Sequence, residues 1–205
     1  MTAKKDSFII IFFSKEGPMS SHQFVDIEIF CPSIKVEVIY ASKNNFTNQI
    51  HYPIAKCFLR RDVAKRLANV QKDLEKIGLG LKIFDGYRPH SVTVSFWNLI
   101  KDIRYVADPA LGSKHNRGAA VDVTLVDFDG KELEMPTPID EMSERAHRDY
   151  DQLTKRTLAN RDLLEEMMTR HGFIPLATEW WHFDDADWEK YPIEDKCLLE
   201  IAKEI

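Results

Sequence analysis

Apolar positions along the chain follow two patterns, one with the period of strands and one with the period of helices. Alternating or β-branched segments bounded by turn residues predict strands. The segments of this kind are Phe24–Phe30, Lys35–Tyr40, Leu81–Phe84, Ala119–Val126, Phe173–Leu176 and Glu179–Phe183. Asp129-Gly130, just after the most strand-like of them, is a dipeptide typical of hairpin turns. We therefore expect a sheet of short strands.

Three longer segments carry apolar residues at the spacing of one helix face. They are Cys57–Ile77, His90–Ile103 and Leu158–His171. Gly78 and Gly172 follow the first and the third segment, at the position of a helix C-terminal cap. Because strands and helices do not alternate strictly, the pattern predicts an α+β domain with a central, mostly antiparallel sheet flanked by helices.

A chain of 205 residues with 44% hydrophobic content can bury one good core. It shows no internal repeat and no long linker, so we expect a single domain at residues 24–205. The formal net charge of -5 gives no electrostatic reason to expect nucleic acid or an anionic membrane as a partner.

The N-terminal segment, residues 1–23, is expected to be a poorly ordered extension. Its apolar run, Phe8–Phe13, is shorter than the core of a secretory signal and far shorter than a membrane span. The three cysteines form no C-x-x-C pair and are expected to be free thiols, as in a reducing compartment. These features favour a cytoplasmic protein. A weak export signal, which would direct the protein to the periplasm, and a true start at Met19 are alternatives.

Asp122 interrupts an otherwise apolar strand, Ala-Ala-Val-Asp-Val-Thr-Leu-Val. By period-two alternation it shares a face with Ala120 and Thr124, while Val121 and Val123 face the other way. A carboxylate in such a sheet is costly to desolvate unless a positive group meets it, and a metal ion is one such group. A partly exposed aspartate on an edge strand is the alternative, and the pattern does not decide between them.

His115 lies in the loop that leads into this strand, and His182 lies near the end of the domain. Two imidazoles and the Asp122 carboxylate make a suitable zinc shell, with a fourth position left for water. Glu179 lies three residues before His182, where it can accept a proton from a metal-activated water. Taken singly, each histidine is more often a surface or core residue than a ligand. The combination predicts a zinc hydrolase.

Arg88 stands in a rigid Gly-Tyr-Arg-Pro turn, which suits it to meet the oxyanion of a tetrahedral intermediate. Asp85 either orients Arg88 or is only a turn residue. Competing chemistry has little support, because the chain has no G-x-S-x-G elbow, no H-E-x-x-H motif and no phosphate-binding glycine loop.

Together, these motifs resemble a known family. Asp85-Gly-Tyr-Arg-Pro89, Ser113-x-His-x-x-Gly-x-Ala-x-Asp122 and Glu179-Trp-Trp-His182 occur in this order, and Ile139–His147 adds a fourth similar stretch. The chain closely resembles the zinc D-Ala-D-Ala dipeptidases of the vancomycin-resistance type, over most of its length. Related D,D-carboxypeptidases and endopeptidases typically lack the double tryptophan and the D-G-Y-R-P turn. The resemblance implies a hedgehog/D,D-peptidase-like fold.

The resemblance also implies roles for individual residues. One zinc ion per chain would be held by His115, Asp122 and His182. Glu179 would act as general base and general acid, and Arg88 would stabilise the tetrahedral intermediate.

Ser113 and Asp140 would lie near the free ammonium of the substrate, so the expected activity is hydrolysis of D-Ala-D-Ala or a similar D,D-dipeptide. Two alternatives are kept. One is a peptidoglycan D,D-carboxypeptidase or endopeptidase with the same zinc site. The other is a non-catalytic, zinc-stabilised binding domain.

Overall fold

The computed structural model describes residues 23–205. The expected N-terminal extension therefore lies outside the described residues except for Gln23, and so do the apolar run Phe8–Phe13 and the alternative start at Met19. Within the described part of the chain, no helix is long and apolar enough to cross a membrane. Each of the three cysteines is a free thiol, as expected.

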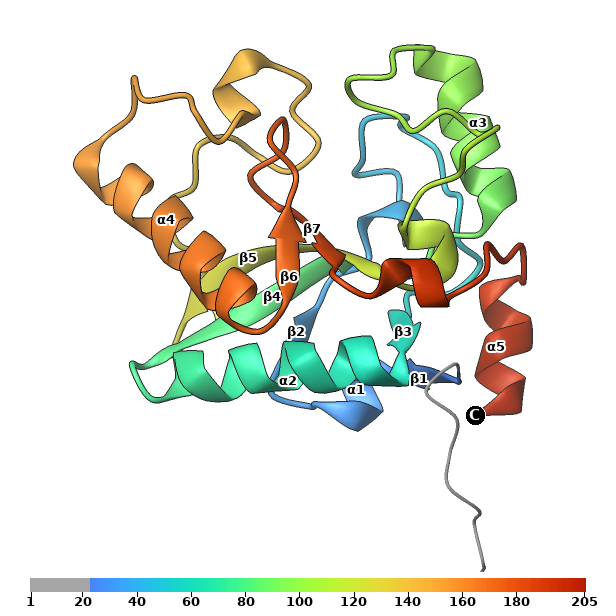
Figure 1. Ribbon diagram of the computed structural model, residues 1–205, viewed down its shortest axis with the longest axis horizontal. Helices are drawn as coiled ribbons and strands as arrows, with labels where there is room; N and C mark the ends of the chain where they lie inside the picture. Colours follow the sequence, from blue (N-terminus) through green and yellow to red (C-terminus); the bar gives the residue numbers. More distant parts are fainter. Residues whose placement is uncertain (1–22) are drawn as a thin grey trace, which may run out of the picture.

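A five-stranded sheet forms the centre of the molecule, with strand order β2-β4-β5-β7-β6 (Figure 1). Its strands are β2 (Lys35–Val36), β4 (Leu79–Asp85), β5 (Ala120–Asp127), β7 (His182–Asp185) and β6 (Phe173–Pro175). Only β2 and β4 pair in parallel, and the other neighbours are antiparallel. The predicted α+β class and the mostly antiparallel sheet are thus confirmed.

Two long helices, α2 (Arg61–Glu75) and α4 (Lys155–Arg170), contact each other and the sheet (Figure 1). Helix α3 (His90–Ile100) follows β4, and α5 (Leu198–Glu204) ends the chain. The three predicted helices therefore exist. The third begins three residues earlier than expected, at Lys155, because the Thr154 side chain accepts a hydrogen bond from the Thr157 amide and caps the helix.

Two predicted strands near the start of the chain are partly wrong. The expected strand Phe24–Phe30 ends at Asp26, where β1 (Phe24–Asp26) gives way to the short helix α1 (Ile27–Phe30). The Asp26 side chain accepts a hydrogen bond from the Glu28 amide, and this local cap replaces strand pairing. Lys35–Tyr40 is a strand only as far as Val36.

The predicted helix Cys57–Ile77 begins later than expected, at Arg61. Its first turn is instead strand β3 (Phe58–Arg60), which pairs antiparallel with β1 in a separate two-stranded sheet. Pairing with a segment more than thirty residues away overrides the local helical spacing, which is a tertiary effect that a periodicity count does not contain.

The predicted strand Glu179–Phe183 is also wrong at its start, because β7 begins only at His182. The Glu179 amide donates to the Leu176 carbonyl oxygen at 3.3 Å, and the Trp180 amide donates to the Ala146 carbonyl oxygen at 3.0 Å. These bonds tie the segment to loops rather than to a neighbouring strand. Glu179 therefore lies on a turn.

The core lies between the sheet and the two long helices. Leu67 and Leu74 of α2 are fully buried, as are Leu81, Val121 and Phe183 of the central strands. Full burial of one such side chain contributes roughly 1.5–3 kcal/mol of hydrophobic stabilisation. Strands β4, β5 and β7 are therefore held firmly, and they carry most of the site described next.

Candidate metal centre

Asp122 and His182 lie directly opposite each other on neighbouring antiparallel strands, β5 and β7. Side chains of such a cross-strand pair point to the same face and have Cβ atoms roughly 4.5–5.5 Å apart. Strand β5 is central, and Asp122 is only 3% exposed. The alternative of an exposed edge-strand aspartate is therefore excluded.

His115 reaches the same point from the short 3-10 helix His115–Arg117, immediately before β5. Its Nδ1 donates to the Gly86 carbonyl oxygen at 2.7 Å, so the protonated nitrogen faces away from the site. This bond leaves Nε2 with its lone pair directed at Asp122 and His182. Gly118 closes the turn with φ +67°, a backbone conformation that L side chains rarely adopt.

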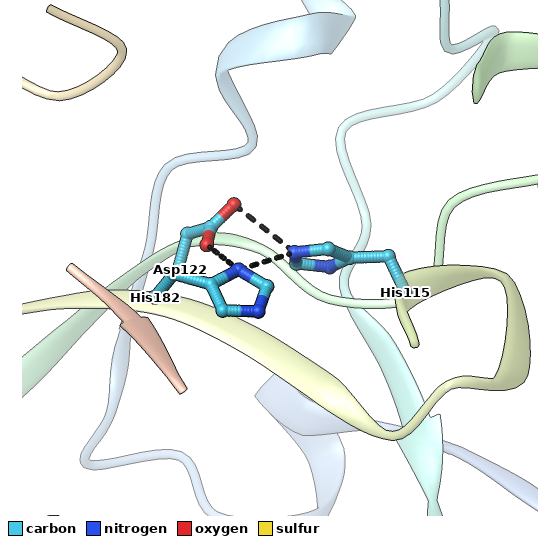
Figure 2. Close-up of side chains that lie close together, drawn as sticks. All are labelled: His115, Asp122 and His182. Atoms are coloured by element: carbon cyan, nitrogen blue, oxygen red, sulfur yellow. Dashed lines mark hydrogen bonds and ion pairs between the residues drawn. The ribbon is translucent and has the colours of Figure 1, made fainter. Parts of the chain in front are cut away.

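The three side chains form a compact metal-ligand triangle, made of His115 Nε2, His182 Nδ1 and the Asp122 carboxylate (Figure 2). The two ring nitrogens are 3.2 Å apart. Asp122 Oδ1 lies 3.0 Å from His182 Nδ1, and Oδ2 lies 3.4 Å from His115 Nε2. Tetrahedral zinc with bonds of about 2.0–2.2 Å needs ligand atoms about 3.3–3.6 Å apart. The residues fit zinc after small adjustments.

The charges around the triangle also favour a bound cation. Burial opposes a charge on His182, but hydrogen bonds to Asp122 and Asp184 outweigh it and raise the pKa of His182 to about 10. The surroundings of His182 therefore favour a positive charge on its ring at neutral pH. A divalent cation can take the place of that proton, because metal ligands must be deprotonated and binding releases the proton.

Asp184 is a site residue that the sequence reasoning missed. Its Oδ1 accepts a hydrogen bond from His182 Nε2 at 2.9 Å, which directs His182 Nδ1 to the triangle. Metal-binding histidines commonly have their second nitrogen held by a carboxylate in this way. The signal was available, since Asp184 follows His182 by two residues on a strand and therefore shares its face.

Glu179 lies beside the triangle without belonging to it. Its Oε2 is 3.9 Å from His182 Nδ1. Burial, together with the negative charge of Asp122, raises the pKa of Glu179 to about 7, against the opposing effect of His182. A carboxyl group with this pKa can both accept and donate a proton near neutral pH.

Arg88 is fixed at the edge of the site by Asp85. Its Nε and Nη2 donate to Asp85 Oδ2 at 3.0 and 2.8 Å, and Nη2 lies 3.7 Å from Asp122 Oδ2. Asp85 also accepts hydrogen bonds from the Tyr52 hydroxyl at 2.9 Å and from the Gly86 amide at 3.0 Å. Of the two interpretations of Asp85, the structure supports the orienting one.

Ser113 and Asp140 line the same cavity as the metal-ligand triangle, and its volume is about 380 Å³. Ser113 Oγ accepts a hydrogen bond from the His115 amide at 3.2 Å. The Tyr40 hydroxyl, which the sequence reasoning also missed, donates to the Asp140 carboxylate at 2.9 Å. Burial and the charge of Asp122 raise the pKa of Asp140 to about 8.

The cleft thus combines three buried side chains that could hold a metal ion with a carboxyl group and a guanidinium. The family model described as D-ala-D-ala dipeptidase, Peptidase_M15, matches residues 20–200. The chain belongs to this family. It is therefore an enzyme of a peptidase family.

Curated relatives agree with the family match. A D-alanyl-D-alanine dipeptidase of Escherichia coli (strain K12) is 36% identical over 83% of this chain and 89% of that protein. A D-alanyl-D-alanine dipeptidase of Enterococcus faecalis is 30% identical over 82% of this chain and 94% of that protein. One of Streptomyces coelicolor is also 30% identical, over 78% and 90%. The likeness therefore extends over most of the length of each relative.

Proposed function

We propose that this protein is a zinc dipeptidase that hydrolyses D-Ala-D-Ala or a similar D,D-dipeptide. One zinc ion per chain would be held by His115, Asp122 and His182. The observation that carries the proposal is the metal-ligand triangle itself, with ligand atoms within 4.8 Å of one another in a cleft that also holds Glu179 and Arg88. Membership of the dipeptidase family supports the same substrate class.

Zinc bound to this triangle supplies a Lewis acid that lowers the pKa of a water molecule to about 7. Glu179 accepts a proton from the attacking water and then delivers it to the leaving amine. A pKa raised to about 7 suits it to both transfers. Arg88, locked by two hydrogen bonds to Asp85, directs its positive charge at the developing oxyanion.

Asp140 and Ser113 are proposed to bind the ammonium group of the substrate. The hydrogen bond from the Tyr40 hydroxyl holds the Asp140 carboxylate in place. An arriving ammonium adds an opposite charge and favours the ionised form of Asp140, against the burial that raises its pKa to about 8. A peptide without a free ammonium leaves Asp140 unpaired, which favours dipeptides over longer chains.

The decisive experiment combines metal analysis of the purified protein with two substrates, D-Ala-D-Ala and a muropeptide ending in the same pair. We expect about one zinc per chain and cleavage of the free dipeptide only. Cleavage of the muropeptide alone would instead support a carboxypeptidase or endopeptidase. A zinc-loaded protein that cuts no D,D-peptide would support a binding domain.

Two ligand variants serve as controls. His115→Ala and His182→Ala should lose both zinc and activity, because each removes one of three protein ligands. Zinc retained at the wild-type affinity in either variant would contradict the proposed ligand set.

A further inference from the structure

Lys114 brings a positive charge into the cleft that the proposed reaction does not use. It stands between Ser113 and His115 in the sequence and lines the cavity that holds the metal-ligand triangle. Its Nζ lies 3.5 Å from Asp184 Oδ2 and 5.3 Å from the centre of the Trp188 ring. A lysine ammonium has three donors, and a contact of 3.5 Å engages one of them weakly. Lys114 can therefore bind a further acceptor.

The two arginines that line the cavity are occupied by other partners. Arg88 Nη2 donates to Asp85 at 2.8 Å, and the Arg88 side chain is only 12% exposed. Arg104 is 67% exposed, and its Nε and Nη2 both donate to Asp102, the latter at 2.6 Å. Among the described residues that line the cleft, Lys114 is thus the non-histidine cation best able to meet an anionic group of the substrate.

A free dipeptide carries an ammonium at one end and a carboxylate at the other. The Asp140 carboxylate, held by a hydrogen bond from the Tyr40 hydroxyl, provides an acceptor for the ammonium in the same cavity as Arg88 and Asp122. Lys114 connects to the site by a different route, through Asp184 and the Nε2 side of His182. The opposite charges of Asp140 and Lys114 therefore match the two ends of a dipeptide.

The length of a dipeptide sets how far Lys114 must reach. A trans peptide unit separates consecutive Cα atoms by about 3.8 Å, so the substrate carboxylate lies only one residue beyond the scissile bond. Lys114 Nζ contacts one oxygen of Asp184, and the other oxygen of Asp184 accepts the hydrogen bond from His182 Nε2. The flexible four-carbon stem of a lysine can adjust over the remaining distance.

We propose that Lys114 binds the C-terminal carboxylate of the dipeptide and so makes the enzyme selective for substrates with a free carboxyl end. This inference rests on the proposed dipeptidase function. Together with Asp140, Lys114 defines the substrate as a short zwitterion bound at both ends. A substrate with a blocked or extended C-terminus loses the charged contact with Lys114.

The test compares kcat/KM for D-Ala-D-Ala and for its C-terminal amide, in the wild type and in Lys114→Gln and Lys114→Arg. One charge-assisted hydrogen bond corresponds to a factor of about ten or more. We expect the wild type to prefer the acid by at least that factor. Lys114→Gln should raise KM for the acid about tenfold with little change in kcat and leave the amide unaffected, so the preference disappears. Lys114→Arg keeps the charge and should restore the preference in part.

Arg104→Gln is the matched control, because it removes a cation from the same cleft. Loss of the acid preference in Arg104→Gln, but not in Lys114→Gln, would overturn the proposal. So would an equal loss for acid and amide in Lys114→Gln accompanied by a lower zinc content, since Lys114 would then act only by supporting Asp184. An unchanged acid preference in a folded, zinc-loaded Lys114→Gln variant would refute this inference alone. No hydrolysis of D-Ala-D-Ala by the zinc-loaded wild type would refute the dipeptidase function itself.

Discussion

At the scale of single residues, burial and neighbouring charge give similar carboxyl groups different roles. Asp122 lies between His115 and His182, and these two imidazoles keep its pKa far below the usual value despite burial. Glu179 lies in the same cleft, and burial raises its pKa to about 7. One group is therefore a permanent anion suited to a metal, and the other is suited to proton transfer. When two carboxyl groups in one site have well separated pKa values, the group with the higher pKa is typically the one that transfers protons.

The first prediction concerns the proton-transfer group. Glu179→Gln preserves the size of the side chain but cannot accept a proton, so kcat should fall by about 10²–10⁴. Zinc content should stay near one per chain, because Glu179 is not in the metal-ligand triangle. Steady-state kinetics with metal analysis measure both quantities. Full activity in a zinc-loaded Glu179→Gln protein would remove the assignment.

The second prediction concerns pH. As a general base, Glu179 must be ionised, so kcat/KM should fall as the pH drops through its pKa. Burial raises this pKa to about 7, and a bound cation adds an opposite charge that lowers it again. The acidic limb of the profile should therefore lie at or below pH 7 in the zinc enzyme. A rate that stays constant down to pH 4 at full zinc occupancy would contradict this role.

At the scale of elements, the turn between β4 and α3 positions both Arg88 and His115. Asp85 ends the strand and holds Arg88, while the Gly86 carbonyl oxygen accepts the bond from His115 Nδ1. The turn therefore fixes both Arg88, the proposed oxyanion-binding group, and the orientation of His115, a proposed metal ligand. The D-G-Y-R-P sequence indicated the turn, but its bond to His115 depends on a loop far along the chain.

A third prediction tests this turn. A Cβ added at Gly86 would lie 2.6 Å from Cys57 Sγ and 2.9 Å from the Phe58 carbonyl oxygen, and the latter is backbone that cannot move aside cheaply. Gly86→Ala should therefore lower the free energy of unfolding by roughly 1–3 kcal/mol. It should also weaken zinc binding, because the carbonyl group that orients His115 must shift. Denaturant unfolding and zinc titration measure the two effects.

Gly80→Ala, on the strand β4 that leads into this turn, is the matched control. The nearest atom to its added Cβ is the end of the Gln71 side chain at 3.1 Å, which can give way more easily. An equal loss of stability and zinc affinity in both variants would contradict a specific role for the turn at Gly86.

At the scale of the whole molecule, the central sheet brings motifs that are far apart in sequence together in one site. The register of β5 against β7 places Asp122 opposite His182, and the register of β4 against β5 places Asp85 opposite Asp122. These strands are buried between other elements, so their geometry is fixed before any ligand arrives. The unfolded chain does not hold His115, Asp122 and His182 together. Metal binding to these three residues should therefore stabilise the fold.

The fourth prediction follows from that linkage. At a free zinc concentration of 100 times the dissociation constant, a ligand that binds only the folded state adds about 2.7 kcal/mol of stability. For a chain of this size, that corresponds to a rise in Tm of roughly 5–10 °C. Removing the metal with a chelator should lower Tm by this amount, and added zinc should restore it. Asp122→Asn should show a smaller response, and an unchanged Tm on chelation in the wild type would contradict the linkage.

The sequence by itself determined which residue types were present and most of the local elements. Motif spacing predicted the triangle of His115, Asp122 and His182, and hydrophobic period predicted strands at Leu81–Phe84 and Ala119–Val126. Hydrophobic periodicity depends on residues that are close along the chain. Most of the helices and strands predicted here depend on the same local sequence.

Only the tertiary structure decided which distant groups meet. Three features depend on how the chain packs. They are the strand at Phe58–Arg60, the turn that carries Glu179, and the hydrogen bonds from Tyr40 to Asp140 and from His182 to Asp184. Pairing, burial and charge at these points are set by segments that lie far apart in sequence or on a strand whose register must first be known. The physical reason is that desolvation and hydrogen bonding act through space.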